Sequence, residues 1–135
     1  MPKSKINIIV VDDNQAFLQS VGFLLMKNNN YTIIKMEANG EQVLKNKNLN
    51  KTDIILMDIE MPKLDGIETT KRLLKNISTI KIIALTNHFE KAYTPKLINA
   101  GFMGCIYKKN TFDQIDDAIQ AVMKGYLYFP EESFC

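Results

Sequence analysis

Short apolar segments recur along the chain at nearly regular intervals, and each of them stops abruptly at polar residues. Apolar runs of this length with little alternation are typical of strands that are covered on both faces. One segment, Tyr31–Glu37, alternates more than the others and carries Lys35, as an edge strand would. The predicted strands span residues 5–11, 31–37, 54–57, 80–85 and 103–107.

Between the predicted strands, apolar residues recur at spacings of three and four, which indicates helices. Asn39 with Gln42, and Thr111 with Gln114, have the spacing of a capping box, in which two side chains satisfy amides at a helix start. The predicted helices lie at about residues 17–27, 39–47, 67–77, 95–100 and 111–124. The buried face of the last helix is expected to consist of Phe112, Ile115, Ile119, Val122 and Met123.

Proline and glycine set two of the predicted helix ends. Pro95 is welcome at the first position of a helix, so Thr94 is expected to be the N-cap and residues 87–93 to be irregular. Gly125 stands where a C-terminal cap belongs. Residues 126–130 after it are apolar and aromatic but too few to form a packed element alone, and the simplest interpretation of residues 126–129 is that they only cover the end of the last helix.

Five strands that alternate with five helices predict a parallel sheet with right-handed crossovers. The expected fold class is α/β: a flavodoxin-like, doubly wound five-stranded sheet of order 2-1-3-4-5 in a three-layer α/β/α arrangement. At 135 residues the chain fits one domain. We expect that domain to span residues 1–125, with residues 126–135 as a tail or the start of a linker.

Composition excludes several classes of function for this segment. Apolar residues at 46% and charged residues at 24% are ordinary for a soluble globular protein. A net charge of +2 is too small to argue for nucleic acid or an anionic membrane as a partner of the segment itself. We find no apolar run of membrane-spanning length and no signal peptide, and two cysteines make no disulfide framework, so a reducing cytoplasm is expected.

Candidate chemistry gathers where the predicted strands end. Asp12 and Asp13 follow the first strand and Asp58 follows the third, and these strands are neighbours in the predicted order. Three adjacent carboxylates repel one another, and Mg²⁺ would relieve the repulsion while leaving room for a phosphoryl group. Thr86 and Lys108 end the fourth and fifth strands and offer a hydroxyl and a cation for that group.

Each of these residues also has an ordinary structural explanation. An Asp-Asp-Asn sequence after a strand often only caps a helix, an aspartate such as Asp58 can form a turn, and Lys108 with Lys109 can be a solvated surface pair. The coincidence of acids, a hydroxyl and an amine at four converging strand ends favours a site. An aspartate opposite a metal can itself act as the nucleophile in phosphoryl transfer.

The segments VVDDN, LMDIEMPKLDGIE, ALTN and AGFMGCIYKKN occur in this order and together resemble the receiver domain of two-component response regulators. The resemblance implies that Asp58 accepts a phosphoryl group from a sensor histidine kinase, and that the chain catalyses only its own phosphorylation and dephosphorylation. It further implies a Mg²⁺ site and two phosphoryl-binding side chains. The implied metal-binding groups are Asp13, Asp58, the backbone carbonyl of Glu60 and, through water, Asp12; the implied phosphoryl-binding residues are Thr86 and Lys108.

The end of the chain, AIQAVMKGYLYFPEE, resembles the receiver-to-linker junction of the NarL/FixJ-type subfamily. Members of that subfamily carry a C-terminal helix-turn-helix DNA-binding domain, which these 135 residues do not contain. The resemblance therefore implies either an excised receiver, which we favour, or a single-domain regulator. In either case phosphorylation is expected to remodel the surface from the fourth strand to the fifth helix and to control dimerisation or an output domain.

Three positions bear on how the signal is timed and transmitted. Many receivers carry an aromatic switch residue where this chain has Cys105, whose side chain is too small for that role. We therefore expect transmission to depend more on the loop after Thr86. Glu60 and His88 each follow a site residue by two positions and are expected to tune the lifetime of the aspartyl phosphate, although His88 is equally consistent with a plain surface residue.

Other classes of function fit the sequence less well. A haloacid-dehalogenase-like phosphatase would share the aspartyl-phosphate chemistry, but its DxD motif is replaced by Asp58 and Glu60, and no cap insertion is present. An interaction module that works without phosphate does not require the acid cluster. A nucleotide-binding flavodoxin-like domain lacks support because no glycine-rich loop follows the first strand.

Overall fold

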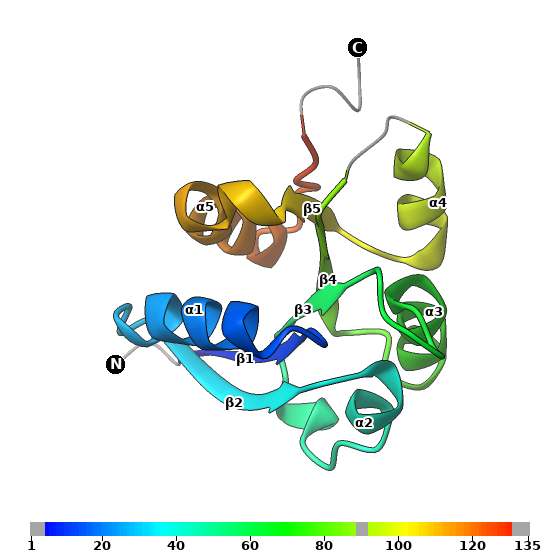
Figure 1. The fold of residues 1–135 in the computed structure, drawn as a ribbon, viewed down its shortest axis with the longest axis horizontal. Coiled ribbons are helices and arrows are strands. Elements are labelled where there is room, and N and C mark those ends of the chain that lie inside the picture. The colour runs from blue at the N-terminus through cyan, green and yellow to red at the C-terminus, as the bar shows by residue number, and fades with distance from the viewer. Residues whose placement is uncertain (1–4, 89–91, 131–135) are drawn as a thin grey trace.

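The computed structural model describes residues 5–88 and 92–130 and shows the predicted α/β fold. Five parallel strands form one sheet in the order β2-β1-β3-β4-β5. Helices α1 and α5 cover one face of the sheet and α2, α3 and α4 cover the other (Figure 1). The predicted fold class and strand order are therefore confirmed, as is the edge position of Tyr31–Glu37.

The strands and helices have the following bounds. The strands are β1 (Ile6–Val11), β2 (Tyr31–Glu37), β3 (Ile54–Asp58), β4 (Lys81–Thr86) and β5 (Gly104–Tyr107). The helices are α1 (Gln15–Met26), α2 (Gly40–Leu44), α3 (Gly66–Asn76), α4 (Tyr93–Ala100) and α5 (Thr111–Met123). Short 3₁₀ turns occupy Leu49–Lys51 and Lys108–Asn110. In the described residues we find no helix long and apolar enough to pass through a lipid bilayer.

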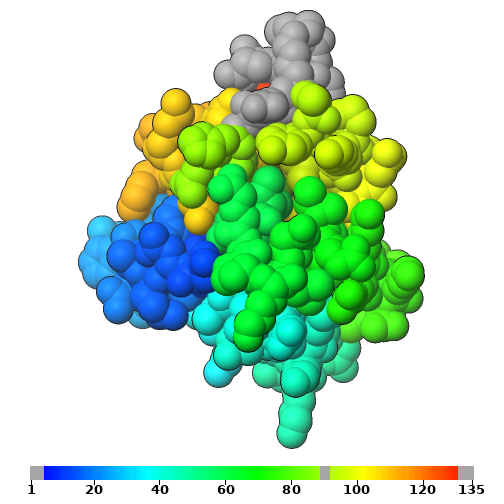
Figure 2. All heavy atoms as spheres, turned by 45° about the vertical axis from the view of Figure 1, so that its right-hand side comes forward, coloured from blue at the N-terminus to red at the C-terminus, as the bar shows by residue number. Residues whose placement is uncertain are grey.

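The core consists of two apolar layers, one on each face of the sheet. Successive strand residues point to opposite faces, so Ile8 and Val10 join the layer under α1 and α5, whereas Ile9 and Val11 join the layer under α2, α3 and α4. Every residue of β3 is buried, which explains its unbroken apolar sequence. In the space-filling view, the N-terminal part of the chain, in blue, packs against the middle part, in green (Figure 2).

Helix α2 is shorter than predicted. Asn39 caps it as expected, because its side chain accepts a hydrogen bond from the backbone N–H of Gln42 at 2.9 Å. The helix ends at Leu44 instead of continuing to about residue 47. The side chain of Asn46 accepts a hydrogen bond from the backbone N–H of Asn48 at 2.7 Å, and such a local bond competes with continuation of a helix.

Helix α4 begins earlier than predicted. Its first residue is Tyr93, so Thr94 lies inside the helix and makes no cap hydrogen bond, and Pro95 occupies the third position. Proline costs little there because the amides of a first turn have no partner within the helix. Asn87 and His88 are not helical, as expected, while residues 89–91 of the predicted irregular stretch lie outside the described residues.

Helix α5 also departs from the predicted start. Thr111 is the first helical residue, and its hydroxyl donates to the backbone carbonyl of Lys108 at 2.7 Å, so the predicted capping box does not form. The reason is the 3₁₀ turn Lys108–Asn110, because the chain is already in a helical turn when it reaches Thr111. This start turns Phe112 outward, with 62% of it exposed, so it is not part of the buried face.

The C-terminal segment, defined here as residues 126–130, pairs with the sheet. Gly125 has a φ of 91° and ends α5 as predicted. Tyr128 then forms a parallel bridge with Gly104, its N–H donating to the carbonyl of Met103 at 2.9 Å and its carbonyl accepting from the N–H of Cys105 at 2.8 Å. Phe129 is buried in the apolar layer beside α4. The segment therefore pairs with the edge of the sheet at β5 and does more than cover the end of α5. The expected domain boundary at residue 125 stays a prediction.

Candidate functional site

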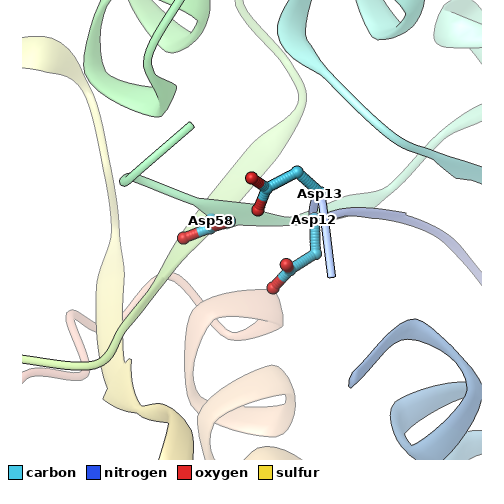
Figure 3. Close-up of side chains that lie close together, drawn as sticks. All are labelled: Asp12, Asp13 and Asp58. Atoms are coloured by element: carbon cyan, nitrogen blue, oxygen red, sulfur yellow. The ribbon is translucent and has the colours of Figure 1, made fainter. Parts of the chain in front are cut away.

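Three carboxylates meet at the C-terminal ends of two adjacent strands. Asp58 is the last residue of β3, while Asp12 and Asp13 directly follow β1. The register that pairs Val11 with Met57 places the two strand ends side by side. One carboxylate oxygen from each of the three residues lies within 4.8 Å of those from the other two (Figure 3). The predicted convergence of Asp12, Asp13 and Asp58 is thus present in the structure.

Asp12 is fully buried and is held by its own loop. Its Oδ1 accepts a hydrogen bond from the backbone N–H of Asn14 at 2.8 Å. Asn14 in turn caps α1, because its side chain accepts from the N–H of Phe17 at 3.1 Å. The ordinary capping function therefore falls on Asn14, which leaves the carboxylates of Asp12 and Asp13 for other partners.

Among the described residues, Lys108 is the one whose ammonium group forms ion pairs with the carboxylates of the site. It follows β5 and opens the 3₁₀ turn that leads into α5. Its Nζ lies 2.6 Å from Asp12 Oδ2 and 3.5 Å from Asp58 Oδ2, and only 11% of the side chain is exposed. Lys108 is therefore a site residue, as predicted, and not a solvated surface lysine.

Electrostatics in the site work against the charged form of Asp58. Burial raises the pKa of Asp58 to about 7, and the negative charge of Asp12 and a hydrogen bond with Asp13 act in the same direction. The backbone N–H of Glu60, 3.1 Å from Asp58 Oδ1, and the charge of Lys108 oppose this rise in pKa. Lys108 alone therefore does not neutralise the cluster.

The donor set fits a hard divalent cation. Three closely spaced carboxylates face the Lys108 ammonium, and Mg²⁺ prefers oxygen ligands that include one or two carboxylates. Burial, and after it the negative charge of Asp12, raise the pKa of Asp58, and a divalent ion would favour its ionised form. The acidic cluster is thus consistent with a divalent metal site, and the part of the backbone carbonyl of Glu60 in it stays a prediction.

Thr86 lies at the end of β4, beside the Asp58 strand, but its hydroxyl has loop partners in the described structure. Oγ1 donates to the backbone carbonyl of His88 at 2.6 Å and lies 3.3 Å from Glu60 Oε1. The backbone N–H of His88 donates back to Oγ1 at 3.2 Å. The structure therefore brings Glu60, Thr86 and His88 together at one rim of the site.

Cys105 lies on β5 within the apolar layer beside α4 and is fully buried. Burial raises the pKa of the Cys105 thiol to about 12, which disfavours the thiolate at neutral pH. That Cys105 does not act as a rotating switch stays a prediction. Its modulating effect on signalling stays a prediction.

One contact at the site was not predicted from the sequence. The aromatic ring of Phe17 lies with its centroid 4.8 Å from Lys108 Nζ. Helical periodicity assigned Phe17 only to the apolar face of the first helix. Phe17 follows Asp13 by four residues and lies in the first turn of a helix that starts at the acid cluster. This position is the signal that could have indicated the contact.

Comparison with known proteins identifies relatives over nearly the whole chain. The family model for the response regulator receiver domain matches residues 8–120. The chain is 29% identical over 126 residues to the transcriptional regulatory protein DegU of Brevibacillus brevis, covering 93% of this chain and 53% of that protein. It is 30% identical over 127 residues to the Fimbriae Z protein of Escherichia coli K12, covering 94% of this chain and 60% of that protein.

Solved structures show the same fold. A LuxR-family two-component response regulator from Aurantimonas sp. SI85-9A1 superposes with a TM-score of 0.89 at 23% identity, covering 96% of this chain and 93% of that one. The non-phosphorylated receiver domain of RcsB from Escherichia coli gives a TM-score of 0.84 at 22% identity, covering 95% and 100%. These matches agree with the predicted likeness to NarL/FixJ-type regulators. The family model, which matches residues 8–120, shows that the chain belongs to the response regulator receiver domain family.

Proposed function

We propose that this domain is a phosphorylation-controlled switch in which Asp58 accepts a phosphoryl group from a sensor histidine kinase in a Mg²⁺-dependent reaction. The observation that carries the proposal is the Asp58 carboxylate at the end of β3, in contact range of two further acids and 3.5 Å from Lys108 Nζ. Phosphoryl transfer needs little beyond such positioning and charge neutralisation. The receiver domain of RcsB from Salmonella enterica has been solved in the presence of the phosphomimetic BeF₃⁻, which supports this class of chemistry in a relative by fold.

Asp58 would act as the nucleophile. One of its carboxylate oxygens forms a bond to phosphorus while the bond from phosphorus to the donor nitrogen of the kinase breaks. The N–H of Glu60 restrains Oδ1, and Oδ2 lies toward Lys108. Asp13, Asp58 and the backbone carbonyl of Glu60 would hold Mg²⁺ directly and Asp12 through water. When bound, Mg²⁺ supplies positive charge that keeps Asp58 ionised and offsets the charge of the incoming phosphoryl group.

Lys108 and Thr86 would bind the phosphoryl group on Asp58. A phosphoryl group adds up to two negative charges and strong acceptor oxygens, with which the Lys108 ammonium can pair. Thr86 would exchange its bond to the His88 carbonyl for one to a phosphoryl oxygen, and that exchange would move the loop after β4. Glu60 and His88, which contact Thr86, would set how long the aspartyl phosphate lasts.

In our proposal, a further domain that is not part of these 135 residues carries out the response to phosphorylation. The chain spans between about half and three fifths of the length of the curated relatives that it matches. DegU of Brevibacillus brevis is a transcriptional regulatory protein, and RcsB dimers have been solved bound to DNA. We therefore propose dimerisation on phosphorylation and DNA binding through a C-terminal output domain, in the cytoplasm. The alternative is a single-domain regulator that acts by docking to another protein.

Incubation with Mg²⁺ and acetyl phosphate tests the proposal directly. The wild-type chain is expected to gain the mass of one phosphoryl group, and Asp58→Asn and wild type with EDTA are expected to gain none. Equal labelling of Asp58→Asn would overturn the assignment of Asp58. Hydrolysis of many equivalents of a small phosphate ester per chain would instead favour the alternative of an aspartyl-phosphate phosphohydrolase.

A further inference from the structure

The ammonium of Lys108 lies among two carboxylates and one aromatic ring. Nζ is 2.6 Å from Asp12 Oδ2, 3.5 Å from Asp58 Oδ2 and 4.8 Å from the centroid of the Phe17 ring. A cation within about 6 Å of a ring centroid is attracted by the negative face of the ring. Phe17 therefore contributes to where the ammonium lies and does more than fill the apolar layer under α1.

Four contacts join these residues in a closed circuit. Asp12 Oδ1 accepts from the N–H of Asn14, and the Asn14 side chain accepts from the N–H of Phe17. The Phe17 ring then meets Lys108 Nζ, which returns to Asp12 Oδ2. Because the cap on α1 and the buried acid belong to the same circuit, the start of the helix holds the backbone of Phe17 beside the site.

An aromatic ring is a suitable neighbour for the Lys108 ammonium, which has to exchange a carboxylate for a phosphoryl group. Lysine has a flexible four-carbon stem, so holding its ammonium in one place costs conformational entropy unless contacts restrict it. A carboxylate in place of the ring would restrict the ammonium too, but it would add negative charge and compete with an incoming phosphoryl group. An aromatic face attracts the ammonium while leaving its N–H groups available to phosphoryl oxygens.

We propose that Phe17 is a positioning residue that holds the Lys108 ammonium toward Asp58 and thereby speeds phosphorylation of Asp58. The inference rests on the proposed phosphoacceptor role of Asp58 and adds a residue to the machinery of that site. In this proposal Phe17 acts through its contact with the Lys108 ammonium and takes no direct part in phosphoryl transfer. A role in packing alone would be met by any apolar side chain of similar size.

The chain offers a matched control for this proposal on the same helix. Phe23 also lies on α1 and also meets a lysine, with Lys27 Nζ 4.5 Å from its ring centroid. Phe23 is 66% exposed, and Lys27 is outside the acid cluster. Phe23→Leu thus removes the same kind of contact from the same helix without touching the site.

Rates of phosphorylation by acetyl phosphate at saturating Mg²⁺ provide the test. Phe17→Leu is expected to lower the rate constant at saturating acetyl phosphate about 3- to 10-fold, the effect of losing one partly buried cation–π contact. Phe17→Tyr, which keeps the ring, and Phe23→Leu are expected to stay near the wild-type rate. A Phe17→Leu rate equal to that of Phe23→Leu would overturn the proposal. If the leucine variant does not fold, Phe17→Met takes its place.

A double variant shows whether Phe17 works through the lysine. In a Lys108→Ala background, Phe17→Leu is expected to cause no further loss of rate. A full further loss would mean that the ring acts independently, and would overturn the proposal.

A spectroscopic readout separates this proposal from the function on which it rests. The ε-methylene protons of Lys108 are expected to be shifted upfield by the ring in wild type and Phe17→Tyr but not in Phe17→Leu. An unshifted wild-type signal would overturn the positioning contact. If the wild-type chain takes up no phosphoryl group at all, the proposed function fails, whatever the spectra show.

Discussion

Thr86 Oγ1 and Glu60 Oε1 lie 3.3 Å apart, which links the loop after β4 to the loop after β3. The same hydroxyl donates to the His88 carbonyl at 2.6 Å, so Thr86 already has partners before any phosphoryl group arrives. A threonine that is to bind a phosphoryl oxygen on Asp58 has to give up these bonds. The resting contacts of Thr86 therefore oppose the switched state that we propose for the domain.

Glu60→Ala is expected to lengthen the lifetime of the aspartyl phosphate. Without the carboxylate, Thr86 loses a competing partner and stays longer on the phosphoryl oxygen, an effect of about 2- to 10-fold for one hydrogen bond. Loss of radiolabel from the phosphorylated domain measures this lifetime. His88→Ala is the companion variant, because His88 holds Thr86 through backbone atoms that the substitution keeps, and a smaller effect is expected. A shorter lifetime in Glu60→Ala would contradict the competition.

Stability of the metal-free domain is expected to fall as the pH rises from 5 to 8. The pKa of Asp58 is raised to about 7 in the folded state, so the folded state binds the proton more tightly than the unfolded chain does. The stabilisation from that proton is complete below the unfolded pKa near 4 and is lost as the pH passes through 7. Urea unfolding at each pH in EDTA measures the change.

Asp58→Asn is the control for this pH dependence. It removes the titrating group, and it is expected to stabilise the metal-free domain by about 1–3 kcal/mol at pH 8 while changing little at pH 4. Saturating Mg²⁺ is expected to flatten the wild-type profile, because it favours the ionised form. An unchanged slope in Asp58→Asn would assign the titration to another group.

The sequence was sufficient to predict the acid cluster because the strands that carry it are buried on both faces. Asp58 ends a run with no polar residue, so its place at a strand end follows from the pattern, and the order of the strands follows from the doubly wound fold that alternating strands and helices predict. The contact of Phe17 with Lys108 could not be predicted in this way. It joins residues 91 positions apart through the detailed placement of α1 and of the 3₁₀ turn before α5, and periodicity reports only which face of a helix is apolar.

The starts of two helices show a second limit of prediction from sequence. Thr94 and Thr111 have the residue type and spacing of N-caps, yet each lies one or two positions inside its helix. At Thr111 the cause is the 3₁₀ turn that follows β5, which winds the chain before the expected cap. Tertiary placement of the preceding strand end therefore overrode the local capping signal.

Removing the charge of Lys108 is expected to strengthen Mg²⁺ binding. Its ammonium lies 2.6 Å from Asp12 and 3.5 Å from Asp58, so it competes with a cation for the same carboxylates. Lys108→Ala is expected to lower the Mg²⁺ dissociation constant roughly tenfold, since each such ion pair at a partly buried site is worth a few kcal/mol before desolvation. Calorimetric titration measures it, with Lys109→Ala as the control on the neighbouring lysine. Weaker binding in Lys108→Ala would contradict competition for the carboxylates.

Lys63 lies in a strained turn after β3. Its φ is 68°, and the N–H of Leu64 donates to the carbonyl of Pro62 at 2.9 Å, which together form a γ-turn with a left-handed central residue. Lys63→Gly is expected to stabilise the domain by about 0.5–1 kcal/mol, because relief of strain exceeds the extra entropy of glycine in the unfolded chain. Thermal unfolding measures the gain. Lys63→Ala keeps a Cβ and is expected to give none, so an equal gain in both variants would point to the lysine side chain instead.

Phe129 anchors the C-terminal segment to the domain. Its side chain is only 9% exposed, beside α4. Tyr128 next to it bonds through its N–H to Met103, just before β5, and through its carbonyl to Cys105 in β5. Phe129→Ala is expected to destabilise the domain by about 2–4 kcal/mol, because it removes a buried ring at a site that also holds a strand edge. Amide exchange at Tyr128 and Cys105 is expected to accelerate with it, since their shared bonds depend on the anchored segment. Tyr126→Ala, at a ring with 67% exposure on the same segment, is the matched control and is expected to change neither measurement. If Phe129→Ala left amide exchange at Cys105 unchanged, the bridge to Gly104 would hold the segment without the ring, and this part of the chain would be an integral edge of the sheet instead of an anchored tail.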